Sequence, residues 1–82
     1  METRVALIVI IIENPESVEK MNSLLHEFSS YIIGRMGVPY REKGISIISV
    51  VIDAPMNKII SLSGKLVMLE GVSTKTIYSK QN

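Results

Sequence analysis

The segment Gly34–Gly44 gathers most of the side chains in this sequence that could bind a ligand. Its letters are GRMGVPYREKG, with three glycines, a proline, a tyrosine and four charged residues. A planar guanidinium pairs with a carboxylate or another anion through two parallel hydrogen bonds, and the segment holds two arginines and a tyrosine. Glycine weakens a strand unless a β-bulge or a close backbone approach requires it. We therefore predict a ligand or partner site at Gly34, Arg35, Gly37, Tyr40 and Arg41.

The alternative interpretation is that this segment only turns the chain. Arg41–Gly44 has the composition of a hairpin turn, in which Gly44 is free to adopt a positive φ angle. Pro39 is tolerated in a strand at the edge of a sheet, and charged residues on edge strands commonly prevent pairing with other chains. The sequence leaves both interpretations open.

Motifs for catalysis, nucleotides and metals are missing from the sequence. The glycines of the segment match neither G-x-G-x-x-G nor a Walker loop, and no helix is expected after them. The chain has one histidine, His26, no cysteine, and no G-x-S-x-G motif. We expect no catalytic residue, no metal site and no cofactor, and a small enzyme that uses His26 is the weaker rival hypothesis.

Length and composition indicate one folded domain over residues 1–82. Apolar residues make up 46% of the chain, which is too many for a disordered segment. A formal net charge of +1 provides no field that would attract nucleic acid or an anionic membrane. The longest apolar run, Val5–Ile12, is far shorter than the roughly 20 residues of a spanning helix, and no cleavage site follows it. We expect a cytoplasmic protein that binds neither nucleic acid nor membrane directly.

Two halves of the sequence share one pattern. Val5–Ile12 and Ile45–Ile52 are β-branched runs typical of central strands. Each is followed by an apolar stripe with spacings of 3, 4 and 3, and the second stripe lies 41 residues after the first. The stripes are Val18, Met21, Leu25 and Phe28 in a helix over about 15–29, then Ile59, Leu62, Leu66 and Leu69.

Two further strands complete the predicted fold. Tyr31–Tyr40 and Val72–Tyr78 are rich in β-formers, which gives the order βαββαβ. Two interleaved right-handed βαβ crossovers form an antiparallel four-stranded sheet in the order 4-1-3-2, with both helices on one face. The predicted class is an α+β, ferredoxin-like sandwich.

The second face of this sheet is predicted to be an oligomer interface. If the 41-residue shift also holds for the strands, Leu7, Val9 and Ile11 point to the helices with Ile48, Val50 and Ile52. The opposite face, apolar as well, should then be covered by a second copy in a dimer or larger homo-oligomer. A partner domain on another chain is the alternative cover. The predicted interface residues are Ala6, Ile8, Ile10, Ile47, Ser49 and Val51.

RNA-recognition domains share this topology, but they stack bases on aromatic residues of the two central strands. Val5–Ile12 and Ile45–Ile52 contain no aromatic residue, so RNA binding by this mechanism is not expected.

The segments GRMGVPYREKGISIISVVID and SGKLVMLEGVSTKTIYSK resemble the iron-only hydrogenase system regulator family. The resemblance spans essentially the whole chain and implies an ACT-like fold, similar to the effector domain of nickel-responsive regulators. It also implies a non-enzymatic regulatory or sensing role, with small-ligand binding and a hydrogenase maturation protein as a partner.

The chain departs from the relatives of that family at three points. The loop Glu13–Pro15 lacks the glycine that amino-acid-binding ACT domains have there, and the nickel-binding histidines and cysteine of the repressors are absent. No DNA-binding segment precedes the first strand, so contact with DNA would need a partner. A purely structural protein–protein interaction module without a ligand is the alternative function.

Overall fold

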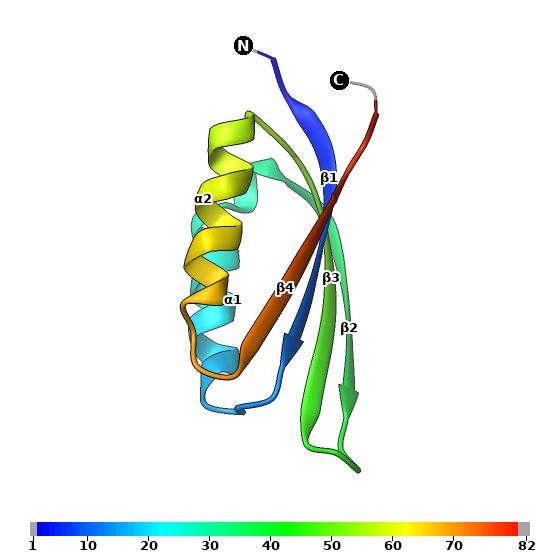
Figure 1. Cartoon of the computed structure of the whole chain (residues 1–82), viewed down its shortest axis with the longest axis vertical. Helices are drawn as coiled ribbons and strands as arrows, with labels where there is room; N and C mark the ends of the chain where they lie inside the picture. The colour runs from blue at the N-terminus through cyan, green and yellow to red at the C-terminus, as the bar shows by residue number, and fades with distance from the viewer. Residues whose placement is uncertain (1, 81–82) are drawn as a thin grey trace.

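The structure, a computed structural model, describes residues 2–80 and has two layers, a β-sheet and a pair of helices on one of its faces (Figure 1). The sheet has four antiparallel strands in the order β2-β3-β1-β4, which is the predicted order counted from the other edge. The predicted α+β, ferredoxin-like fold is therefore confirmed. The elements are β1 (Arg4–Ile12), α1 (Ser17–Glu27), the 3₁₀ turn η1 (Ser29–Tyr31), β2 (Ile32–Tyr40), β3 (Ile45–Ala54), α2 (Met56–Val67) and β4 (Val72–Tyr78).

The hydrophobic core lies between the sheet and the helices. The helix-facing sides of the two central strands are almost fully buried, and Ile8 and Val50, which pair directly, are both 0% exposed. Such strands accept β-branched residues because the branched side chains pack well on a pleated surface. The buried strand residues of β1 and β3 are Ala6, Ile8, Ile10, Ile12, Ile48, Val50, Ile52 and Ala54.

The predicted helical stripes pack against this layer. Met21, Leu25 and Phe28 from the first stripe are buried, as are Ile59, Leu62 and Leu66 from the second. Val18 and Leu69 are partly buried at the margins of the same cluster. Apolar residues one turn apart share one side of a helix, which explains why these positions reach the core.

The predicted orientation of β1 was wrong. Ala6, Ile8 and Ile10 do not lie on the second face of the sheet, since all three are buried under the helices at 2% exposure or less. A one-residue shift along a strand moves every side chain to the other face, because the side-chain period is two. Ile47, Ser49 and Val51 do lie on the second face.

The error has its origin in the connection that follows each central strand. The buried strand ends Ile12 and Ala54 are 42 residues apart, whereas the buried helix residues Met21 and Leu62 are 41 apart. The path from the buried strand end to the matching buried helix residue is thus one residue longer in the first half, from Ile12 to Met21, than in the second, from Ala54 to Leu62. Strands and helices therefore repeat with different shifts.

The longer connection is fastened by specific contacts. Asn14 Oδ1 accepts a hydrogen bond from the Glu16 N–H at 3.0 Å, and α1 begins at Ser17, two residues later than expected. The Ser17 hydroxyl is buried and donates to the Glu70 carbonyl at 2.6 Å. Gly71, with φ of +70°, lies so close that a Cβ there would be 2.8 Å from the Asn14 Cβ. These contacts lock the loop before α1 against the loop before β4.

The β2–β3 hairpin extends past the ends of the helices and makes the molecule elongated (Figure 1), with extents of 42 × 19 × 17 Å. Its turn ends at Gly44, whose φ of +66° suits glycine, as expected. A register shift between Ile32 and Gly34 makes Ile33 an extra residue in β2. A Cβ at Gly34 would meet nothing within 4 Å, and Gly34 has no positive φ, so neither the bulge nor a close backbone approach requires glycine there.

Candidate functional site

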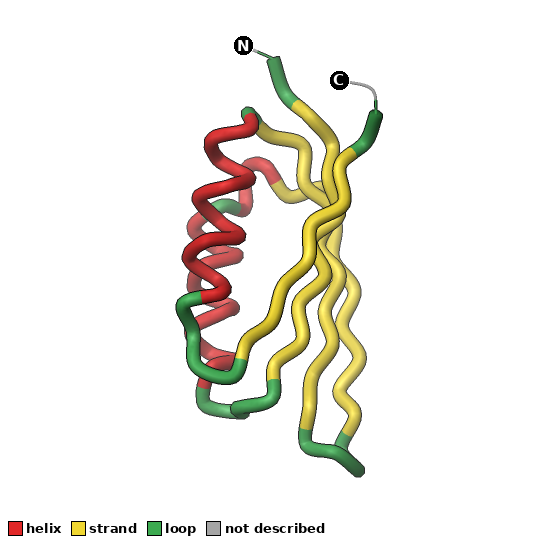
Figure 2. Tube along the Cα trace, in the orientation of Figure 1, coloured by secondary structure: helices red, strands yellow, loops and turns green. Residues whose placement is uncertain are grey.

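The face of the sheet opposite the helices is apolar, and no element of residues 2–80 covers it (Figure 2). Directly paired residues share a face, so the register of the strands defines its members. We call it the open sheet face. Its apolar side chains are Val5, Leu7, Val9 and Ile11 of β1, Met36, Val38 and Tyr40 of β2, Ile45, Ile47 and Val51 of β3, and Ile77 of β4. Its polar side chains on β3 and β4 are Ser49, Asp53, Ser73 and Lys75.

Exposure on the open sheet face is highest on the two edge strands. Met36 is 71% exposed, Val38 53% and Ile77 57%, whereas the central residues are half-buried by their neighbours in the sheet. At the end of the face where β1 begins and β4 ends, Val5, Leu7, Val51 and Ile77 help to line an apolar hollow of about 310 Å³. An apolar face of this kind, contiguous over four strands, marks an interaction surface more often than a solvated one.

The five residues predicted as a ligand site do not form one cluster. Gly34 and Tyr40 lie opposite Val51 and Ile45, on the open sheet face, and Arg41 lies in the hairpin turn. Arg35 and Gly37 lie opposite Val50 and Ile48, on the side of the helices. The strand alternation thus divides the five residues between two faces and a turn.

Arg35 instead meets α1 across a cleft at the edge of the sheet. Its Nη2 donates to Asn22 Oδ1 at 2.9 Å. The two residues help to line a hollow of about 310 Å³, to which α1 and the turn after it also contribute His26 and Ser29. Sequence reasoning missed Asn22 and Ser29 as neighbours of Arg35 and treated His26 separately. We call this hollow the Arg35 cleft; its lining residues are Asn22, Leu25, His26, Ser29, Ile32 and Arg35.

The hairpin register turns Arg35 toward α1, because regular alternation from the pair Tyr40 and Ile45 beside the turn places Arg35 opposite Val50. Ile32 is paired with Ile52 on the helix side, and after the extra residue Ile33 the pairing resumes with Gly34 opposite Val51. Without the extra residue, Ile32 would lie opposite Asp53 on the open sheet face, whereas Arg35 would keep its place opposite Val50. Bulges commonly redirect a side chain near functional sites.

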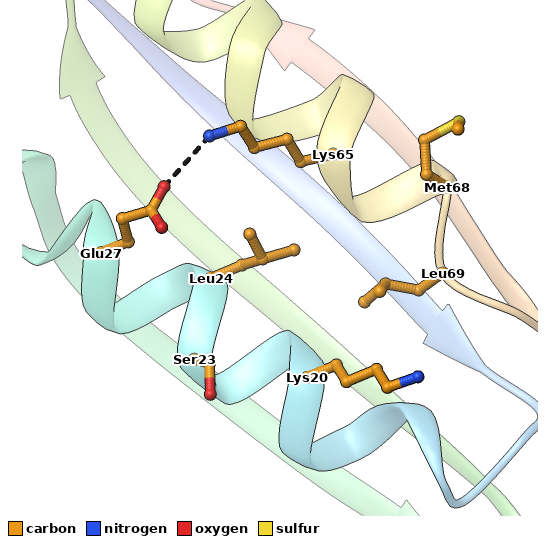
Figure 3. Close-up of a pocket in the computed structure, with 7 residues that line it drawn as sticks. All are labelled: Lys20, Ser23, Leu24, Glu27, Lys65, Met68 and Leu69. Atoms are coloured by element: carbon orange, nitrogen blue, oxygen red, sulfur yellow. Dashed lines mark hydrogen bonds and ion pairs between the residues drawn. The ribbon is translucent and has the colours of Figure 1, made fainter.

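A larger hollow, of about 430 Å³, lies between the two helices (Figure 3). Leu24 and Leu69 point into it, and Met68 at its rim is 83% exposed. Lys65 reaches across to Glu27 at 3.1 Å and also lies 5.4 Å from the centre of the Phe28 ring. The ion pair bridges the two helices, and the leucines belong to the margin of the core, so this groove is explained by helix packing.

Metal and membrane sites are not evident in the described part of the chain. Residues 2–80 contain no group of three or more His, Cys, Asp or Glu side chains placed to hold a metal ion. Neither helix in that range has the length and apolar character needed to cross a bilayer. His26, the residue of the rival enzyme hypothesis, is an exposed member of the Arg35 cleft.

Comparison with known protein families decides the family of this chain. Residues 4–76 match the model of the TM1266-like family, whose description is "Iron-only hydrogenase system regulator, putative". The chain belongs to this family. The predicted resemblance is therefore confirmed, and the description assigns the family a regulatory role rather than a reaction.

One solved structure agrees with this assignment, and a second shares the fold. The uncharacterized protein TM1266 from Thermotoga maritima is similar with a TM-score of 0.92 and 36% identity, over 96% of this chain and all of the other. A protein of unknown function from Galdieria sulphuraria has a TM-score of 0.65 at 15% identity, over 99% of this chain and 48% of the other, and shows likeness of fold alone. The comparison with curated proteins gives no match.

Proposed function

We propose that this chain is a non-enzymatic regulatory domain of the iron-only hydrogenase system that works as a homo-oligomer built through its open sheet face. The family description supports the regulatory role. The observation that supports association is the apolar sheet face without a cover in residues 2–80, with Met36, Val38 and Ile77 more than half exposed. A hydrogenase maturation protein is the partner class to which such an oligomer would respond.

The size of the open sheet face suits an interface between two copies. Four strands spaced about 4.8 Å apart, the longest of ten residues rising about 3.4 Å each, cover an area on the order of 600 Å² in flat projection. Side-chain relief increases the accessible area beyond this projection, and a standard interface buries about 800 Å² on each partner. Two-fold packing of this face on itself would therefore use nearly all of it, as in aligned β-sandwiches.

Residues of the open sheet face replace part of the predicted interface set. Ile47, Ser49 and Val51 remain in the proposed interface, because they lie on this face. Leu7, Val9 and Ile11 of β1 take the place of the three buried β1 residues. The edge residues Met36, Val38 and Ile77 extend the surface to the full width of the sheet.

Light scattering of Val9→Glu tests the proposal. Val9 lies at the middle of the face and pairs with Lys75, so a glutamate there gains a cross-strand partner and the monomer keeps its fold. The wild type is expected at twice 9.1 kDa or more at micromolar concentration, and Val9→Glu at one subunit mass. The matched control is Ile60→Glu on α2, a residue 57% exposed on the other layer, which should leave the wild-type mass unchanged. A wild type that stays monomeric would contradict association with a second copy.

The regulatory role needs a cellular readout. In a host that makes an iron-only hydrogenase and carries this gene, deletion is expected to change hydrogenase activity, and Ile60→Glu to restore it. Val9→Glu should fail to restore it, because the protein would be folded but unable to associate. Full restoration by a monomeric Val9→Glu protein would show that the regulatory role does not depend on association through the open sheet face. An unchanged hydrogenase activity after deletion would contradict the regulatory role itself.

A further inference from the structure

The Arg35 cleft combines a cation with other hydrogen-bonding groups but contains no acid. Neither its lining nor that of a smaller hollow of about 210 Å³, which shares Asn22 and Arg35 with it, includes an aspartate or glutamate. Within residues 2–80, no carboxylate lies within ion-pair distance of the Arg35 guanidinium, and its hydrogen bond goes to the neutral Asn22 side chain. Glu27 of α1 is paired with Lys65. The guanidinium is thus held in place by α1 without being neutralised.

Polar side chains of α1 and η1 line the cleft together with this guanidinium. Asn22 and His26 are one turn apart on α1, and Ser29 follows about one turn later in η1, so the three can share one flank. An arginine offers five N–H donors in a fork that fits a carboxylate, and the Ser29 hydroxyl and His26 imidazole can each donate another hydrogen bond. These groups suit an oxyanion at the mouth of the cleft.

The inner wall of the cleft is apolar. Leu25 is 2% exposed and Ile32 is half-buried, and both line the same hollow as Arg35. A volume of about 310 Å³ lies at the low end of the range for small-molecule sites, which commonly pair apolar walls with a few polar groups. A ligand with an anionic end and a short aliphatic part would satisfy both features.

We infer that the Arg35 cleft binds a small organic carboxylate. The carboxylate accepts hydrogen bonds from the Arg35 guanidinium, with His26 and Ser29 beside it, and the aliphatic part lies against Leu25 and Ile32. The hairpin register places Arg35 on the helix side, and the bulge at Ile33 brings Ile32 to the same side. This inference deepens the proposed sensing role, since it names the ligand class for a regulatory domain.

β2 connects this cleft with the open sheet face. Arg35 faces α1, whereas the next residue along the strand, Met36, faces the proposed interface, as does Val38. A ligand that fixes Arg35 against α1 therefore also restricts the strand that supplies the exposed edge of the interface. Association is expected to change when the cleft is filled.

An NMR titration of the labelled wild-type protein tests the inference, with acetate, pentanoate, succinate and inorganic phosphate as probes at constant ionic strength. Saturable amide shifts are expected at Asn22, His26, Ser29 and Arg35, with pentanoate or succinate tighter than acetate. Arg35→Gln should weaken binding about tenfold or more, since it removes a charged hydrogen-bonding partner. Arg41→Gln, which removes an exposed arginine of the hairpin turn, is the matched control and should bind as the wild type does.

The other outcomes have definite meanings. Shifts that do not saturate, or that are equal in Arg35→Gln and Arg41→Gln, would overturn the inference and leave Arg35 as a charge that protects the sheet edge. Phosphate binding tighter than every carboxylate would overturn the assignment of the ligand class. Repeating the titration on monomeric Val9→Glu separates the two proposals, because binding there with wild-type affinity supports the cleft even if association fails.

Discussion

Leu7 of β1 lies directly opposite Val51 of β3, on the face of the sheet that no helix covers. Their neighbours Ile8 and Val50 also lie opposite each other but are fully buried under the helices. The central strands are therefore apolar on both sides, although residues 2–80 provide a cover for only one. This pairing leads to a direct test of which side forms the core of the subunit.

The first prediction compares Ile8→Ala with Leu7→Ala in urea unfolding. Ile8→Ala removes buried methyl groups from the core and should lower the free energy of unfolding by about 2–5 kcal/mol at every protein concentration. Leu7→Ala should cost less in dilute protein, and its cost should rise with protein concentration, because it weakens an interface that stabilises by mass action. A larger loss for Leu7→Ala at high dilution would reverse the assignment of the two faces.

The second prediction concerns the contact between the loops before α1 and β4. Gly71→Ala combines a positive φ with a Cβ placed 2.9 Å from the Asn14 backbone nitrogen, so backbone must move to accept it. Gly44→Ala has a similar φ of +66° and open space around the Cβ. We expect Gly44→Ala to cost about 1–2 kcal/mol of unfolding free energy and Gly71→Ala clearly more, measured by thermal or urea unfolding. Equal costs would show that the close approach to Asn14 is unimportant.

The third prediction addresses the buried hydroxyl of Ser17. Its hydrogen bond to the Glu70 carbonyl joins the start of α1 to the end of the α2–β4 connection. Ser17→Ala should destabilise the protein by about 1–3 kcal/mol, because it leaves a partly buried carbonyl without that donor. Ser63→Ala, which removes an exposed hydroxyl bound to the Ile60 carbonyl, is the matched control and should change stability by less than about 0.5 kcal/mol. Similar effects of the two substitutions in urea unfolding would contradict this role for Ser17.

The fold could be predicted because the residue patterns that determine it are local. The helical stripes and the β-branched runs identify the elements, and the crossover rule gives the sheet order. The orientation of β3 could also be predicted, because Ser49 and Asp53 are polar and lie four residues apart, on the same open side of the strand. β1 is apolar from Val5 to Ile12, and such a run contains no alternation from which to choose a face.

The candidate ligand site was predictable only in part. Strand alternation alone separates Gly34 and Tyr40 from Arg35 and Gly37, so the division of that set was within reach of the sequence. The direction of Arg35 was readable too, since the predicted turn Arg41–Gly44 pairs Tyr40 with Ile45 and thereby places Arg35 opposite Val50. The bulge at Ile33, which brings Ile32 into the same cleft, was not readable, because it depends on the pairing of β2 with β3. The α1 residues around Arg35 follow from that tertiary arrangement.

The measurement that tests the central claim most directly is the solvent exposure of methyl groups on the open sheet face, probed by NMR with a soluble paramagnetic agent. The account predicts that the methyl signals of Leu7, Val9 and Val51 are broadened as little as those of the buried Ile8 and Val50. The signal of Ile60, exposed on α2, should be strongly broadened in the same sample and serves as the internal reference. Broadening of Leu7, Val9 and Val51 to the level of Ile60 would contradict the claim that a second copy of the chain covers this face.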